Sequence, residues 1–303
     1  MTSLRLFLLF LAAVLLSALP LRAEYRFVAS SRYVKIYGTR ETAASTQKLR
    51  DMLDDAIDEI QRETGIYLDD GPDIYIVPDS RSYQSLSLGR QRVVEFSDAF
   101  YSGKEGRIYI KSREQLGAQY LKILTHEYIH WYIEQLLEGA TLWFHEGMAM
   151  LFARQLSWES YIYFTQQRFF GRHSNLFEMS YRYPDNPNDW QIYYLTSHFA
   201  ISYLKNKKPE GWKRFWNQVA FDHKQGRKSV FIRTFGNSFH TSLLDFNNEF
   251  DAHCQSLAWQ YLILGFNTLL FAFLPFLVLY IYFKRRKRMK SLPDLPLPDE
   301  GVE

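Results

Sequence analysis

Residues 126–130 are His-Glu-Tyr-Ile-His, and a further carboxylate, Glu146, lies in the sequence Trp-Phe-His-Glu-Gly-Met-Ala at residues 143–149. On a helix, side chains four positions apart point the same way, so His126 and His130 can present both imidazoles to one metal ion. Two histidines and one carboxylate are typical ligands of a catalytic Zn²⁺, which keeps its fourth position for water. The spacing therefore predicts a zinc site with His126, His130 and Glu146 as ligands.

Glu127 follows the first histidine, so on a helix it lies beside the expected ion. Zinc lowers the pKa of a bound water to about 7, and a neighbouring carboxylate can take that proton and pass it to a leaving amine. We therefore predict peptide-bond hydrolysis with Glu127 as the general base. The alternative is a pair of core histidines satisfied by hydrogen bonds, with Glu127 as a surface residue.

Two adjacent residues, His145 and Glu146, are candidates for the third metal ligand. The metzincin pattern is excluded, because the positions where it requires Gly and His hold Ile133 and Leu136. His145 precedes Glu146, but adjacent helical residues point about 100° apart, so at most one of them faces the ion. We choose Glu146 as the ligand and expect His145 at the rim of the site.

The elements that must position these residues follow from periodicity. Residues 119–137 carry apolar side chains with helical recurrence, Gly139 fits just past the helix end, and a second helix is expected to begin near Thr141. Upstream, we expect strands at residues 33–37, 73–77 and 107–111, a helix at residues 46–64, and a polar rim or unstructured connection at residues 87–106. This order predicts an α+β fold in which a small mixed sheet and the zinc helix precede a mainly helical half.

These motifs resemble those of the gluzincin metallopeptidases, most closely the Peptidase MA-like group, in which His-Glu-x-x-His is followed by Trp-x-x-Glu-Gly-x-Ala. The resemblance implies a zincin-like fold, a Zn²⁺ cofactor and a peptide or protein substrate, with residues 107–111 bordering the substrate cleft as an edge strand. Residues 194–204 resemble a later helix of the family, from which a tyrosine stabilises the oxyanion. That role falls on Tyr194, with Tyr193 and His198 as less favoured candidates.

Two segments predict contact with a membrane. Residues 1–23 resemble a secretory signal cleaved after Ala23, and residues 259–283 form an apolar stretch long enough to span a bilayer. The basic run at residues 284–290 begins a basic and Pro-rich tail (284–303) and predicts a cytoplasmic C-terminus. We therefore expect residues 24–258 to form a catalytic domain outside the cytoplasm, with a linker near residues 253–258.

Composition narrows the setting and the partners. The net charge of +3 owes much to the basic run, so it does not indicate nucleic-acid binding. The single cysteine, Cys254, precludes an internal disulfide, and no glycosylation sequon occurs. Both features favour a bacterial envelope protein. Together with the two membrane segments and the basic run, they predict a single-pass type I arrangement with the catalytic domain in the periplasm.

Residues 158–170 contain too many aromatic side chains for one helix face. Packing against the zinc helices is the favoured interpretation, and exposure near lipid is the alternative.

Two function classes follow from the sequence. The first is a membrane-anchored zinc metallopeptidase. The second is a catalytically silent zincin-like module for binding or assembly in the cell envelope. We favour the enzyme, because the chain keeps the candidate base Glu127 as well as the three candidate ligands.

Overall fold

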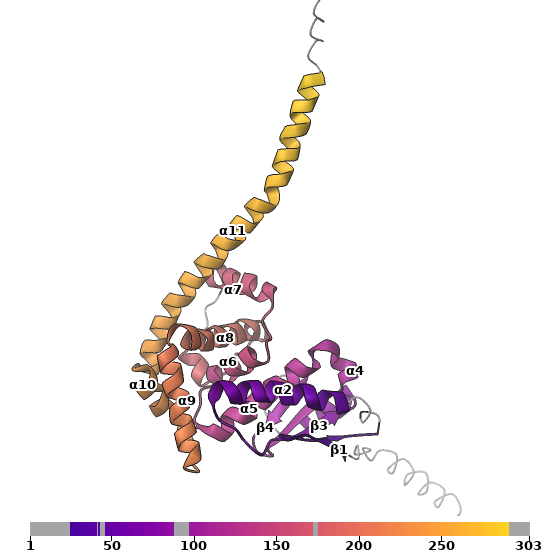
Figure 1. Ribbon diagram of the computed structural model, residues 1–303, viewed down its shortest axis with the longest axis vertical. Coiled ribbons are helices and arrows are strands. Elements are labelled where there is room, and N and C mark those ends of the chain that lie inside the picture. Colours follow the sequence, from indigo (N-terminus) through magenta and orange to yellow (C-terminus); the bar gives the residue numbers. More distant parts are fainter. Residues whose placement is uncertain (1–24, 41, 43–45, 88–96, 172–174, 291–303) are drawn as a thin grey trace, which may run out of the picture. The chain divides into compact units, whose positions relative to one another are not determined.

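The computed structural model describes residues 25–40, 42, 46–87, 97–171 and 175–290 of the chain. These residues form a mixed α+β structure that is mostly helical, and it ends in one long apolar helix (Figure 1). The α+β class predicted from the sequence is therefore confirmed. The expected signal peptide at residues 1–23 and the last part of the tail, residues 291–303, lie outside the described residues.

The chain divides into two compact units. The first contains residues 1–156 and 174–247, and the second contains residues 157–173 and 248–303. The described elements of the first unit are β1 (Arg26–Ser30), β2 (Lys35–Gly38), α2 (Thr46–Thr64), β3 (Asp73–Val77), α3 (Ser80–Ser87), β4 (Ala99–Ser102), β5 (Arg107–Lys111), α4 (Arg113–Leu116), η2 (Gly117–Gln119), α5 (Tyr120–Leu136), β6 (Leu137–Glu138), α6 (Leu142–Phe152), η3 (Glu178–Ser180), η4 (Pro187–Asp189), α8 (Trp190–Lys207), α9 (Pro209–Lys224), β7 (Ser229–Val230) and α10 (Phe231–Phe239). The second unit contains α7 (Trp158–Phe170) and most of α11 (Leu243–Lys290), which begins in the first unit.

The main sheet has the strand order β1-β2-β3-β5-β4. Strands β2, β3 and β5 are parallel, whereas β1 and β4 pair antiparallel at the two outer positions of the described sheet. On one face, Ile36, Ile74 and Ile108 align across the three parallel strands and are fully buried. Side chains alternate between the two faces of a strand, so this row of isoleucines forms the apolar side of a small mixed sheet.

The other face carries a ladder of aromatic rings. Tyr37, Tyr75, Tyr109 and Phe100 occupy neighbouring positions on β2, β3, β5 and β4, and their stacked ring centroids lie 4.9, 5.3 and 5.0 Å apart. Cross-strand aromatic pairs stabilise strand pairing, and they pin the register because a one-residue slip would turn every ring to the opposite face. The ladder therefore holds β4 in register beside β5.

One sequence prediction for this region is wrong. Strand β5 is an interior strand between β3 and β4, so residues 107–111 do not form the expected edge strand. The segment predicted as a polar rim or unstructured connection contains β4, which takes the outer position, and residues 88–96 of that segment lie outside the described residues. Four residues are too few for a period of two to stand out, and only pairing with β5 identifies them as a strand.

The two helices that carry the candidate ligands match the sequence prediction closely. Helix α5 spans Tyr120–Leu136, and α6 begins at Leu142 after a turn in which Gly139 has φ 68°. Helix α8 packs closely against α6 at Gly147, where an added Cβ would lie 2.3 Å from the carbonyl oxygen of Ser197. Glycine at this position therefore permits the approach of α8, the helix that carries Tyr194.

An aromatic core supports α6 within the first unit. Trp143 and Phe144 on this helix are at most 1% exposed, and rings from α9, α10 and the start of α11 surround them. Phe144 lies 4.9 Å from Phe231 and 5.6 Å from Phe215 between ring centroids. Aromatic side chains bury a large apolar area each, so this core fixes the position of α6.

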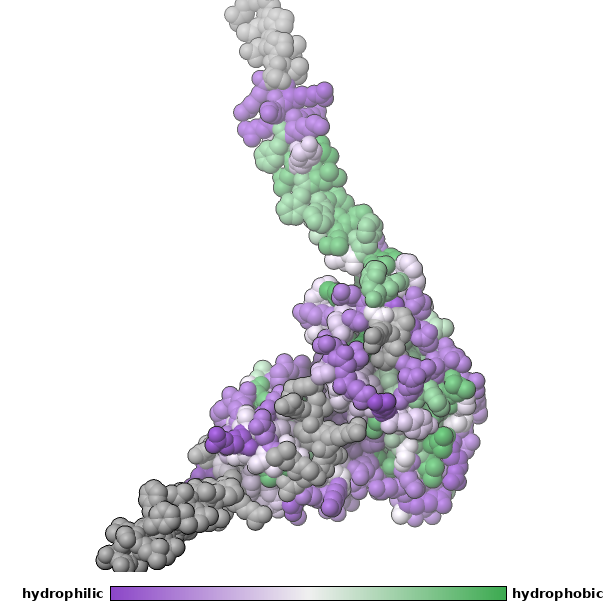
Figure 2. All heavy atoms as spheres, turned by 180° about the vertical axis from the view of Figure 1, so that it is seen from behind, coloured by the Kyte–Doolittle hydropathy of each residue, from purple (hydrophilic) through white to green (hydrophobic). Residues whose placement is uncertain are grey.

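Helix α11 has a long exposed apolar stretch that is long and apolar enough to span a membrane. Figure 2 shows this stretch as a continuous run of hydrophobic residues, followed by hydrophilic residues toward the C-terminal end of the helix. The linker predicted near residues 253–258 is instead part of α11, because nothing in that segment, such as Gly or Pro, ends a helix. Pro275 lies within the helix.

Candidate metal centre

Three side chains from two helices converge at one point in the first unit. Glu146 on α6 places its Oε2 atom 3.2 Å from Nε2 of His126 and 3.6 Å from Nε2 of His130, both on α5. One potential ligand atom from each residue lies within 4.8 Å of the others, so the group could hold a metal ion. The structure therefore brings together the three residues that the sequence proposed as ligands.

The two distances from Oε2 of Glu146 agree with those around a tetrahedral ion. With ligand bonds of about 2.0–2.1 Å, two donors on a tetrahedral zinc lie about 3.4 Å apart. The distances of 3.2 and 3.6 Å bracket that value. Oε2 of Glu146 is buried and has no well-aligned hydrogen bond of its own, as expected for an oxygen that serves as a ligand.

A second contact fixes the orientation of His126. Its Nδ1 atom lies 3.0 Å from Oε1 of Gln155, an acceptor, and in the tautomer that donates from Nδ1 to this oxygen, Nε2 is free to bind a metal ion. Metal-ligating histidines commonly donate their other ring N–H in this way. Sequence patterns do not identify Gln155, because its role depends on how the chain leaves α6.

A left-handed turn at the end of α6 brings Gln155 back to the site. Arg154 has φ 50°, a conformation that non-glycine residues rarely adopt, and its guanidinium binds both carboxylate oxygens of Glu59 at 2.7 and 2.9 Å. The backbone N–H of Gln155 then donates to the carbonyl of Met150 at 3.2 Å. The turn reverses the chain, so that the Gln155 side chain reaches His126 on α5.

The electrostatics of the three converging groups are strongly coupled. Burial raises the pKa of Glu146, but His130, His126 and Tyr183 outweigh this effect and hold the pKa at about 2. Burial lowers the pKa of His130 to about 3. Burial is the largest single influence on His126 and lowers its pKa, yet the contacts with Glu146, Glu127 and Gln155 together outweigh burial and the net shift is upward. Glu146 is therefore a carboxylate and His130 a neutral ring at neutral pH, which are the forms that bind a cation.

Glu127 faces the same cavity from α5. Its Oε2 atom accepts a hydrogen bond from the backbone N–H of Tyr101 on β4 at 2.8 Å. Burial raises the pKa of Glu127 to about 7, even though His126 and the Tyr101 N–H both favour the carboxylate. A carboxyl group with a pKa near neutrality can both accept and return a proton.

Of the three candidates for oxyanion stabilisation, Tyr194 lines the cavity. Its ring centroid lies 6.2 Å from that of His126, and burial raises the pKa of its hydroxyl, which keeps the proton available for donation. Tyr193 is buried and donates to the carbonyl of Met179 at 3.0 Å, so its hydroxyl is engaged elsewhere. His198 lies one turn beyond Tyr194, 3.1 Å from the hydroxyl oxygen of Ser202, and does not line the cavity.

Tyr183 is a site residue that the sequence did not suggest. Its hydroxyl donates to Oε1 of Glu146 at 2.9 Å, and its ring stacks on Trp190 with centroids 5.2 Å apart. The contact leaves Oε2 of Glu146 directed at the two histidines. Tyr183 lies between η3 and η4, outside any recognisable motif, so no periodicity or spacing would have identified it.

The cavity around these groups has a volume of about 310 Å³ and is acidic and aromatic. Glu127, Glu134 and Glu146 line it, and no lysine or arginine of the described residues does so. His145 also lines it, with its ring centroid 5.8 Å from that of His130, which agrees with the rim position expected from the sequence. The remaining lining residues are Ser97, Ala99, Phe100, Tyr101, His126, His130, Leu142, Tyr183, Trp190 and Tyr194.

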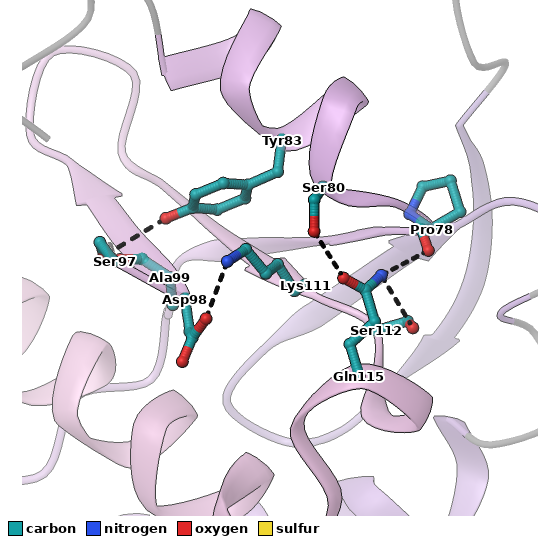
Figure 3. A network of polar contacts seen from close by, with 9 residues as sticks. All are labelled: Pro78, Ser80, Tyr83, Ser97, Asp98, Ala99, Lys111, Ser112 and Gln115. Carbon is teal, nitrogen blue, oxygen red and sulfur yellow. Dashed lines mark hydrogen bonds and ion pairs between the residues drawn. The ribbon is translucent and has the colours of Figure 1, made fainter. Parts of the chain in front are cut away.

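Residues of β4 line the cavity, and the two residues just before this strand bond to β5 and α3. Figure 3 shows Lys111 of β5 paired with Asp98 at 2.8 Å, and the Tyr83 hydroxyl of α3 donating to Ser97 at 3.4 Å. In the same view, Gln115 donates to the carbonyl of Pro78 at 2.6 Å. The contacts of Ser97 and Asp98 hold the residues just before β4 against β5 and α3, and they help to keep the Tyr101 N–H opposite Glu127.

Comparison with known proteins does not identify the chain, because no protein-family model matches it and no curated protein matches it.

Proposed function

We propose that this chain is a membrane-anchored zinc metallopeptidase of the gluzincin type, with a zincin-like catalytic domain similar to the Peptidase MA-like group. The observation that carries the proposal is the convergence of Glu146 Oε2 on both histidine Nε2 atoms, at 3.2 and 3.6 Å, with Glu127 in the same cavity. His126, His130 and Glu146 would hold the zinc. When bound, zinc acts as a Lewis acid and makes water acidic enough to attack near neutral pH.

Glu127 acts as the general base in this proposal. It accepts a proton from the attacking water and then delivers it to the leaving amine of the cleaved peptide bond. The Tyr101 N–H contact at 2.8 Å holds the carboxyl group in place during both transfers. Tyr194 donates its hydroxyl proton toward the carbonyl oxygen as that oxygen gains negative charge.

The remaining side chains orient the ligands. Gln155 keeps the proton of His126 on Nδ1, and Tyr183 holds Oε1 of Glu146. Such contacts typically change metal affinity or activity by about 10- to 100-fold when they are removed. His145 contributes to the cavity wall beside His130.

We further propose a single-pass type I arrangement in the bacterial envelope. The exposed apolar part of α11 would cross the membrane, and the basic residues 284–290 would remain in the cytoplasm. The first unit, with its cavity, would then lie in the periplasm and act on peptides or proteins there.

The experiment that tests the activity compares three forms of the purified full chain in a peptide-library digest, with bound zinc measured for each. Glu127→Gln should lower cleavage about 10²- to 10⁴-fold while retaining the zinc, because it removes the proton acceptor but no ligand. Glu138→Gln is the matched control at an exposed position just beyond α5, and it should cleave like the wild type.

Zinc bound to a wild-type chain that cleaves nothing in the library would exclude the peptidase and favour the silent binding or assembly module. Absence of zinc from the wild type would exclude the zinc metallopeptidase.

A further inference from the structure

One face of α7, in the second unit, is an exposed apolar stripe. Trp158, Ile162 and Phe170 are 68%, 49% and 89% exposed, and together with Gln166 they occupy every fourth position of the helix. Helical residues four positions apart lie on the same side. Three large apolar side chains along one helix face mark an interaction surface, whereas single exposed apolar residues scattered over a protein need no explanation.

The other side of α7 is held against α11 within the same unit. Arg168 is buried and its guanidinium donates to the carboxylate of Asp251 at 2.8 Å and to its backbone carbonyl at 3.1 Å. Aromatic contacts extend this anchoring, because Tyr161 meets Tyr261 and Phe169 meets Trp259 with ring centroids 5.0 and 4.8 Å apart. These contacts leave the stripe as the outward face of α7.

The contact between Tyr161 and Tyr261 places the first turns of α7 where the apolar run of α11 begins. From Tyr261 to Phe283 that run contains no charged residue, and its side chains from residue 262 onward are exposed. Trp259 and Trp158, both more than half exposed, lie on the two helices near this point. Tryptophan and tyrosine are enriched at the level of the lipid headgroups, where their apolar rings and polar atoms are both accommodated.

We propose that the stripe of α7 lies in the headgroup region of the bilayer that α11 crosses. Two observations favour lipid as the occupant. The contact between Tyr161 and Tyr261, on the side of α7 opposite the stripe, places the first turns of α7 beside the apolar run of α11, and Trp158 at that end of the stripe is an aromatic type that suits an interface. Helices α7 and α11 thus form one membrane-contacting element, in which α11 crosses the bilayer and α7 lies in the interface beside it.

The test uses the full chain, reconstituted through α11 into vesicles of phosphatidylcholine and phosphatidylglycerol. A spin label is attached to Ile162→Cys in a Cys254→Ala background, and its accessibility to oxygen and to a water-soluble nickel chelate is measured. Two further labelled positions serve as references: Phe273→Cys within the apolar run, and Phe221→Cys on α9, which is 55% exposed.

The label at residue 162 should favour oxygen over the nickel chelate, less strongly than the label at residue 273 because it lies nearer to the headgroups, and the label at residue 221 should show the reverse. A nickel-accessible label at residue 162, with lipid-like behaviour at residue 273, would overturn the proposal. Protection of residue 162 from both reagents would also overturn it, because that pattern means the stripe is covered by protein. Nickel access at residue 273 would show that α11 does not cross the bilayer, and the proposed position of α7 in the interface would be overturned as well.

The same label at Phe170→Cys measures how far the contact extends along α7. Lipid-like accessibility at both positions means that the whole stripe lies in the interface. A lipid-like signal at residue 162 and a nickel-accessible one at residue 170 would still support the proposal, with the contact confined to the first turns, where Tyr161 meets Tyr261.

Discussion

Helices α5 and α6 bury polar side chains, whereas the later part of α11 exposes apolar ones. On α5 and α6, Thr125, His126 and Glu146 are at most 9% exposed. On α11, Phe271, Phe273 and Phe276 are 65–70% exposed. Each region departs from the ordinary rule that apolar groups lie inside and charged groups outside, and the two depart in opposite directions.

The difference shows which surroundings stabilise each region: polar partners for the buried side chains of α5 and α6, and lipid for the exposed apolar side chains of α11. Buried charges are costly unless they face opposite charges or hydrogen-bonding partners, and the converging histidines, Tyr183 and Gln155 provide such partners around Glu146. Exposed apolar area is costly only in water, so a long uncharged helix is stable when its surroundings are lipid. The first region could therefore hold a cation, and the second is long and apolar enough to span a bilayer.

The largest expected effect is on the free energy of unfolding, and it compares a buried aromatic residue beside the site with an exposed one on α11. Phe144→Ala should lower the free energy of unfolding of the first unit by about 3–5 kcal/mol, because Phe144 is fully buried among aromatic rings. Phe271→Ala, at a position that is 70% exposed, should change it by no more than about 0.5 kcal/mol. Urea unfolding of the detergent-solubilised chain measures both, and equal losses would remove the distinction between the two regions.

The next effect tests the apolar region directly. Leu270→Lys should make membrane insertion of α11 less favourable by about 2.5–3.5 kcal/mol, since a charge would lie within the apolar run. Leu244→Lys changes a similarly exposed leucine near the start of α11, outside that run, and should leave insertion unchanged. The fraction of chain inserted into membranes in a translation assay is the measurement. Equal insertion of all three forms would argue that α11 does not span.

A third prediction concerns a titratable ring near the site. Burial lowers the pKa of His198 from 6.5 to about 4. Between these two pH values the unfolded chain binds a proton that the folded chain does not, so this contribution is complete above pH 6.5 and is lost as the pH falls to about 4. The loss is at most about 3.5 kcal/mol, since one pKa unit corresponds to about 1.4 kcal/mol.

The measurement is the free energy of unfolding between pH 7 and 4, for the wild type and for His198→Gln. The wild type should lose more stability over this range than the variant, which has no ring to titrate. Parallel curves would mean that the protonation of His198 is the same in the folded and unfolded chains.

The smallest effect concerns the hydrogen bond to Glu146. Tyr183→Phe should weaken zinc binding about 10- to 100-fold, because it removes the donor to Oε1 while keeping the ring stacked on Trp190. Tyr181→Phe removes a hydroxyl from a residue that is 67% exposed and serves as the matched control. Competition with a chromogenic zinc chelator gives both affinities. A Tyr183 variant that binds as tightly as the control would show that this hydroxyl does not orient the ligand.

Sequence alone determined the elements whose signal is local. Helical periodicity located α5 to within one residue at each end, and the turn at Gly139 predicted the start of α6 near Thr141. The uncharged run in α11 was evident from composition alone. Such features depend on residues within a few turns of one another, so they can be deduced before the fold is known.

Only the tertiary structure decided which residues surround the candidate metal centre. Gln155 meets His126 because of the left-handed turn at Arg154, and Tyr183 meets Glu146 from a segment without periodicity. The outer position of β4 follows from pairing with β5, and the approach of Tyr194 depends on the close packing at Gly147. These contacts join residues far apart in the chain, and they depend on how helices and strands pack, which periodicity within any one segment does not encode.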